Sequence, residues 1–387
     1  MTFGTLALLA AAGLLGPLIA SLHRLAPPAV VGEIAAGVVV GHTGLGWLNT
    51  DDASLKLLSQ VGFALLMFIV GTHLPLRDAR LRSAIGRAAF AALLTAALAI
   101  GAGFVLAPHL QLDRPLVLAV LIAASSAAIA LPVLQGLGSA KSTVVTAWIT
   151  ILDVVTVLAI PLVTPSGRIT RVIEGGVLVI AASLLLYLAA HQFLDDRMIT
   201  RIRRASVRHG WALDLRVSLL MLFAMAWVAT RFGTSILIAG FAAGAVVAVL
   251  GEPRRVAQQL VGLGEGFLVP IFFVDLGAQL DLHALVRQRS AIVLGLVLLA
   301  ANVVVHTVTA SIFRLRIGAG LLACAQLGVP SAIVAIGLQT KLLTPAGGAA
   351  VMGAVLASIA VCTVGAAVLG HHQQLTDHAA PNGATAT

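Results

Sequence analysis

One aspartate stands alone in a long apolar run. Asp153 lies near the centre of ITILDVVTVLAIPL, with no lysine or arginine within one helical turn. Apolar surroundings without a cationic partner favour the protonated carboxyl, which can exchange its proton for a metal cation. Thr150 precedes it by three residues, so a helix places both side chains on one face. The alternative is a structural aspartate that bonds to a neighbouring helix.

A serine pair lies in the apolar segment before it. Ser125 and Ser126 occur in LIAASSAAIALPVLQGLG, and their hydroxyl oxygens suit a hard cation. Asp153 and Ser126 are the predicted ligands of a monovalent cation, with Ser125 and Thr150 beside them. Serines in membrane helices also bond to backbone or permit close packing, which is the competing interpretation.

Further polar residues lie in other apolar segments and are accessory candidates. Asp275, in PIFFVDLGAQL, either lines an access path or caps the end of a helix. Asn302 and His306 are four residues apart and share a helical face. His306 either pairs with an acid and responds to pH or bonds to one backbone carbonyl. Glu33 is interpreted as structural, paired with a basic loop residue.

The composition decides the environment of these groups. Hydrophobic residues make up 59% of the 387 residues and charged residues only 10%, against roughly 25% charged in soluble domains. The chain is therefore a polytopic membrane protein. Its net charge of +9 is spread over short loops, which suits lipid headgroups and argues against nucleic acid. Cys324 and Cys362 lie in apolar segments and suggest neither a disulfide framework nor a metal site. No cofactor is expected beyond the transported ions.

The membrane region is predicted to cover residues 1–369, and the polar tail 370–387 is expected to be disordered. A helix needs about 20 apolar residues to cross a bilayer. The predicted spans are 3–22, 29–46, 55–74, 84–107, 115–136, 144–164, 172–193, 211–230, 234–250, 259–280, 290–312, 318–340 and 346–369.

Basic residues are unevenly divided between the two sets of loops. Loops on the side of the N-terminus carry Lys56, Arg114, Arg168, Arg171, Arg231, Arg287, Arg289 and Lys341. The opposite loops carry almost twice as many. The positive-inside rule therefore predicts an external N-terminus and a cytoplasmic C-terminus in the plasma membrane.

The two halves of the chain resemble each other. IAAGVVV at 34–40 matches FAAGAVV at 241–247, GFALLMFIV at 62–70 matches GFLVPIFFV at 266–274, and SSAAIAL at 125–131 aligns with PSAIVAI at 330–336. Matched spans are an odd number apart, which predicts two five-helix repeats of inverted topology, as in secondary transporters. The glycine pairs Gly37/Gly41 and Gly240/Gly244 predict close helix packing, within the chain or at a subunit interface.

Two spans at equivalent repeat positions carry helix-breaking residues. The fifth has Pro132, and the twelfth has Gly328 and Pro330 in ACAQLGVPSAIVAIG. Proline removes a backbone donor, so freed carbonyls and half-helix ends can face an ion. We expect two crossed broken helices near the midplane, against the simpler alternative of two proline kinks.

Taken in order, the motifs resemble the monovalent cation:proton antiporter superfamily. They are PPAVVGEIAAGVVVGHTGLGWL, VGFALLMFIVGTHLPLRDARLR, SSAAIALPVLQGLG, ILDVVTVLAIPL and FLVPIFFVDLGAQLDL, and the most similar branch holds bacterial sodium/proton exchangers and potassium-efflux systems. The resemblance implies a homodimer in which a core domain moves against a dimerisation domain. The core would hold the spans within 55–164 and 259–369, and the dimerisation side those within 3–46 and 172–250.

The resemblance also assigns roles. The family's essential aspartate falls on Asp153, while electrogenic members have a second acid where this chain has Leu152. We therefore expect electroneutral exchange of Na+ or K+ for H+, not an enzyme reaction. One alternative is a non-transporting membrane sensor on the same fold. The other is an intramembrane aspartyl protease built on Asp153 and Asp275, although it leaves the inverted repeat unexplained.

Overall fold

A computed structural model gives the fold of the chain. Every regular element in the described ranges is a helix, in agreement with the predicted all-α class. The structure describes residues 1–22, 29–72, 79–110, 112, 114–127, 129–130, 134, 140–164, 174, 177–178, 181, 185, 205–206, 208–209, 211–231, 236–250, 259 and 262–379.

Long apolar helices dominate these ranges. Within them, six helices have the length and composition to cross a membrane: Ala53–Thr72, Ala84–His109, Thr143–Val163, Arg289–Ile312, Ile317–Gln339 and Pro345–Leu369. Helices suit this environment because they satisfy every interior backbone group within one segment. Most of the predicted span 172–193 lies outside the described residues.

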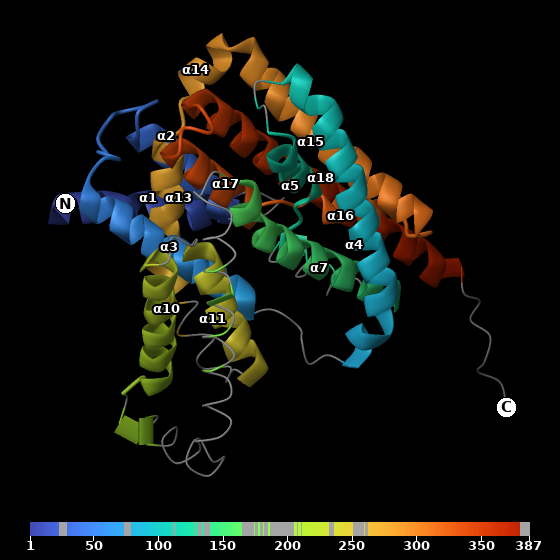
Figure 1. The fold of residues 1–387 in the computed structure, drawn as a ribbon, viewed down its shortest axis with the longest axis horizontal. Helices are drawn as coiled ribbons and strands as arrows, with labels where there is room; N and C mark the ends of the chain where they lie inside the picture. Colours follow the sequence, from blue (N-terminus) through green and yellow to red (C-terminus); the bar gives the residue numbers. More distant parts are fainter. Residues whose placement is uncertain are drawn as a thin grey trace. The chain divides into compact units, whose positions relative to one another are not determined.

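The chain divides into two compact units. The first comprises Met1–Asp78, Val157–Arg287 and Ala332–Ala349. Its helices are α1 (Phe3–Leu22), α2 (Ala29–Val40), α3 (Ala53–Thr72), α10 (Leu213–Arg231), α11 (Ile236–Leu250), the π-helical turn η2 (Gly264–Leu268), α13 (Val269–Ala278) and α14 (Leu282–Arg287). In this unit α3 packs on α11 and α13, α2 packs on α1 and α13, and α10 runs beside α11 (Figure 1).

Glycines allow two of these helix pairs to touch through their backbones. A Cβ added at Gly37 would collide with the carbonyl of Val274, so α2 lies directly on α13. A Cβ at Gly244 would likewise collide with the carbonyl of Phe68, which joins α11 to α3. The two GxxxG patterns therefore serve packing within the chain, as small residues do between membrane helices. The alternative that these glycines lie at a subunit interface is not supported, because they already contact neighbouring helices of the same chain.

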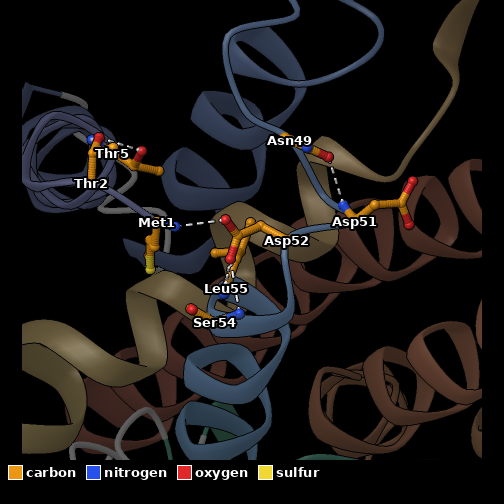
Figure 2. Close-up of polar contacts among 8 residues, drawn as sticks. All are labelled: Met1, Thr2, Thr5, Asn49, Asp51, Asp52, Ser54 and Leu55. Carbon is orange, nitrogen blue, oxygen red and sulfur yellow. Dashed lines mark hydrogen bonds and ion pairs between the residues drawn. The ribbon is translucent and has the colours of Figure 1, made fainter.

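Polar groups at the start of α3 connect it to the start of α1. The Oδ1 of Asp52 accepts hydrogen bonds from the backbone N–H of Ser54 at 2.8 Å and of Leu55 at 3.2 Å, which caps the helix (Figure 2). Its Oδ2 lies 2.8 Å from the ammonium group of Met1. The ammonium, followed by the backbone donors, lowers the pKa of the Asp52 carboxyl below its ordinary value. This carboxylate thus ties two helices together outside the membrane spans.

The second unit comprises Ala79–Thr156, Gln288–Ser331 and Ala350–Thr387. It contains α4 (Ala79–Leu106), the 3-10 turn η1 (Ala107–His109), α5 (Pro115–Ala123), most of α7 (Ala140–Val163), α15 (Arg289–Ile312), α16 (Ile317–Ala323), the first turn of α17 (Gly328–Gln339) and most of α18 (Pro345–Ala379). Helix α15 packs against α4, α5 and α16 (Figure 1). Trp148 of α7 is fully buried in the hydrophobic core of this unit.

Candidate functional site

Two helical segments are interrupted at positions that lie in the second unit. Helix α5 ends at Ala123, and residues 124–126 are non-helical before the helical residue Ala127. Helix α16 ends at Ala323, and α17 begins only at Gly328. The prediction of two broken spans is therefore confirmed. The interruptions precede the prolines: Pro330 lies in the first turn of α17, and Pro132 lies outside the described residues.

The two interruptions cross and bond to each other. The backbone N–H of Ser126 donates to the carbonyl of Ala325 at 2.6 Å. The hydroxyl of Ser125 donates to the carbonyl of Ala323 at 2.7 Å. Each interruption leaves carbonyls without helical partners, and these two bonds satisfy one at the end of α16 and one just after it. The structure thus brings together, at one crossing, two segments about 200 positions apart in the sequence.

Side-chain amides satisfy the carbonyls at the end of α5. The last helical bond runs from the N–H of Ala124 to the carbonyl of Val120, which leaves later carbonyls without a helical donor. The amide of Gln326 donates to Leu121 O and, at 3.1 Å, to Ala124 O. The amide of Asn302, on α15, donates to Ile122 O at 3.0 Å. The carbonyls of Leu121, Ile122 and Ala124 therefore already accept hydrogen bonds.

Asp153 is directed at this crossing. It lies on α7 with 6% of its surface exposed, and its Oδ2 accepts a hydrogen bond from the N–H of Ala127 at 3.0 Å. Ala127 is the first helical residue after the interruption, so its N–H has no helical partner of its own. Among the described residues, Oδ1 of Asp153 receives no hydrogen bond and the carboxylate makes no ion pair. One carboxylate oxygen is thus held in place by the start of the helical segment that follows the interruption.

The other predicted ligands lie in the same unit. Ser126 is adjacent in sequence to Ala127 and is buried. The hydroxyl of Ser125 donates its hydrogen bond to Ala323 O, and its oxygen can still accept a hydrogen bond or bind a cation. Thr150 donates its hydroxyl to Thr146 O of its own helix at 2.8 Å and is half-buried.

His306 contacts no acid in the part of the chain that the structure describes. Its Nδ1 lies 2.9 Å from the carbonyl of Asn302, as in the backbone alternative, and its Nε2 has no described partner. Its ring centroid is 5.9 Å from that of Trp148. The indole N–H of Trp148 donates to the hydroxyl of Thr95 at 3.1 Å, which in turn bonds to Thr309 at 3.2 Å. This buried polar network links α4, α7 and α15.

The two remaining acids lie in the first unit. Asp275, on α13, accepts a hydrogen bond from the amide of Gln279 at 3.1 Å, and Ser59 of α3 also bonds to it. Glu33 of α2 is buried against Gly16 of α1, and its Oε2 has no partner among the described residues. The structure shows no ion pair between Glu33 and a basic residue within the described ranges, so the basic loop partner expected for it stays a prediction.

Sequence reasoning missed Gln326, whose side chain joins the second interruption to the end of α5. Its side chain bonds to the α5 segment, and its backbone N–H donates to Ser358 Oγ of α18 at 3.2 Å. The available signal was a single uncharged amide in the apolar run ACAQLGVP. A buried amide needs partners, so its position beside a helix-breaking glycine was informative.

The family follows from a comparison with known proteins. Residues 9–370 match the model of the transmembrane sodium/hydrogen exchangers. The chain belongs to the sodium/hydrogen exchanger family. The resemblance to monovalent cation:proton antiporters is thereby confirmed. Because this is a family of transporters, the alternative of an intramembrane aspartyl protease is wrong.

Individual relatives are distant. The protein named as a Na+/H+ antiporter, YjbQ of Bacillus subtilis (strain 168), is 24% identical to this chain over 375 residues. The match covers 89% of this chain and 59% of YjbQ. The glutathione-regulated potassium-efflux system protein KefC of Klebsiella pneumoniae (strain 342) is 26% identical over 286 residues, covering 71% of this chain and 45% of KefC. The chain thus spans only about half the length of these two relatives.

A solved structure supports the fold. The sodium proton antiporter MjNhaP1 from Methanocaldococcus jannaschii, at pH 8, superposes with a TM-score of 0.60. The match covers 95% of this chain and 97% of that one, at 16% identity. The TM-score and the coverage show that the two chains share their architecture despite the low sequence identity. The chain therefore has the all-helical fold of this antiporter.

Proposed function

We propose that the chain exchanges Na+ or K+ for H+ across the plasma membrane, with Asp153 carrying both ions in turn. The observation that supports this most strongly is the buried Asp153 carboxylate, held on one oxygen by the N–H of Ala127. A proton and a monovalent cation each neutralise the same carboxylate, so they compete for it. Ser126, Ser125 and Thr150 supply the remaining protein oxygens, and the bonded α5 carbonyls are weaker ligand candidates.

Alternating access is the second part of the proposal. Asp153 and both helix interruptions belong to one compact unit of the chain. An elevator-type movement would carry such a unit, with its ion, across the membrane while its internal hydrogen bonds persist. The division into core and dimerisation sides, the homodimer, the inverted repeat and the external N-terminus remain predictions.

Exchange in proteoliposomes tests the carrier. Replacing Asp153 with Asn keeps the size of the side chain but removes titration, so cation-driven proton movement should be lost while the thermal unfolding transition is retained. Asp51→Asn is the matched control, because Asp51 is exposed outside the spans and pairs only with Lys56 among the described residues. Undiminished exchange by folded Asp153→Asn protein would refute the assignment. If the wild-type protein moves no ions at all, a sensor on the same fold is the better description.

One carrier implies electroneutral exchange. Leu152 is buried where electrogenic relatives would place a second acid, so each cycle should move one cation against one proton. Transport measured with the membrane potential clamped at zero and at a large negative value should then be the same. A strong dependence on potential that disappears in Asp275→Asn would instead make Asp275 a second carrier.

A further inference from the structure

An open apolar groove lies on the second unit between α4 and the end of α15. Its volume is about 460 Å3, and its walls carry one charged side chain. Large hydrophobic side chains form these walls and are exposed: 67% of the surface of Phe90 and 59% of that of Ile312 is accessible. The lining includes Arg87, Phe90, Leu94, Ala97, Ile312 and Phe313. A groove of this volume is within the range of small-molecule sites, which run from roughly 300 to 1,000 Å3.

The length of the groove along α4 matches the thickness of one leaflet of a bilayer. The span predicted from the sequence, 84–107, puts Arg87 in its first turn, where a long cationic side chain reaches the lipid headgroups. From Arg87 the lining follows one stripe of α4 to Ala97. Ten residues of helix rise about 15 Å, which is half of a hydrocarbon core of about 30 Å.

The shallow end of the groove is positively charged. Arg87 donates through Nη2 to the carbonyl of Phe313 at 3.3 Å, which uses one of the five N–H donors of its guanidinium. Arg314 and Arg316 follow Phe313 in the chain, and both are exposed. The loop asymmetry assigns all three arginines to the predicted cytoplasmic side, where anionic lipids concentrate.

We propose that this groove is a binding site for an anionic phospholipid, with one acyl chain along α4 and the phosphate on Arg87. The guanidinium matches phosphate oxygens in charge and geometry. A zwitterionic lipid carries a compensating cation in its headgroup, so it gains less from this end of the groove. The apolar walls supply contact to either lipid, while the arginines supply selectivity.

Native mass spectrometry of the purified full chain tests the site, with phosphatidylglycerol and phosphatidylcholine of equal chain length as probes. The wild-type protein should retain phosphatidylglycerol preferentially. Arg87→Gln should weaken retention of phosphatidylglycerol roughly fivefold and that of phosphatidylcholine by a smaller factor. Arg289→Gln is the matched control, since this exposed arginine lies at the opposite end of α15. Ala97→Trp, which fills the deep end and keeps the charge, should weaken both lipids.

Three results would overturn the proposal. Equal retention of the two lipids by the wild-type protein would show an ordinary lipid-facing surface. An equal loss in Arg87→Gln and Arg289→Gln would show a general effect of charge. A change of oligomeric state in Ala97→Trp without a change in lipid retention would make the groove a contact for a second copy. If Arg87→Gln does not fold, the lipid selectivity of the wild-type protein and the lipid retention of Ala97→Trp decide whether the groove binds the lipid. None of these measurements depends on transport.

Discussion

Replacing Gln326 with Leu should loosen the crossing of the two broken helices. The substitution introduces an apolar side chain of similar volume and removes the amide that donates to Leu121 O and Ala124 O. The backbone bond from Gln326 to Ser358 is unaffected by the change. Leu121 O then has no described donor, while Ala124 O keeps a long contact of 3.5 Å with Asn302.

The expected cost follows from these two carbonyls. A buried polar group left without a partner costs about 1–3 kcal/mol in soluble proteins. Hydrogen bonds between membrane helices average nearer 0.6 kcal/mol, because the unfolded chain in the membrane finds other partners. Because Leu121 O loses its described donor and Ala124 O keeps a long contact, we expect the free energy of unfolding to fall by about 0.6–3 kcal/mol.

Unfolding in mixed micelles and exchange in proteoliposomes check this expectation together. Ala127, which holds Asp153, lies just after the interruption that Gln326 supports, so exchange should also slow. Gln339→Leu is the matched control, because Gln339 is exposed at the end of α17. If Gln326→Leu and Gln339→Leu give the same unfolding free energy and the same exchange rate, the amide does not support the crossing.

Three further perturbations have defined outcomes. Alanine at both Ser125 and Ser126 should raise the apparent KM for the cation more than it lowers the maximal rate, and an unchanged KM in cation titrations would exclude them as ligands. Gly244→Val should abolish the close contact with Phe68 and lower the Tm of the purified protein, whereas an unchanged Tm would contradict the backbone packing. Because the pKa of Asp52 is lowered on folding, its stabilisation is present above the unfolded value of about 3.9 and is lost as pH falls through the folded value. Asp52→Asn should therefore reduce the Tm difference between neutral and acidic buffer, as measured by scanning fluorimetry at both pH values.

Single residues in apolar runs were the most informative part of the sequence. Asp153 could be recognised because an ionisable group has few structural reasons to lie at membrane depth. The helix interruptions were predicted from prolines, but they lie several residues earlier, at Ala124–Ser126 and after Ala323. A proline is tolerated at the start of a helix, so Pro330 marks where α17 begins more than where α16 stops.

Pairings between distant segments could not be derived from the sequence. The glycine patterns predicted close packing, yet nothing local indicates that Gly37 meets Val274 or that Gly244 meets Phe68. The same holds for Gln326, because a buried amide needs hydrogen-bond partners but does not indicate which carbonyls they are. Local residue types thus indicate which groups need partners, whereas the chain's tertiary arrangement decides which partners they find.

The crossing also constrains how the chain can be assembled in the membrane. The hydroxyl of Ser125 and its acceptor on Ala323 are separated by 198 positions. At synthesis rates of about 5–20 residues per second, the first interrupted helix must wait roughly 10–40 s for the second. During that time its end carbonyls have no native donors, although unpaired backbone groups are costly in lipid. We therefore expect this segment of the nascent chain to stay near water, a protein channel or temporary hydrogen-bond partners until residues 323–327 have been made. The crossing then forms late in the assembly of the chain.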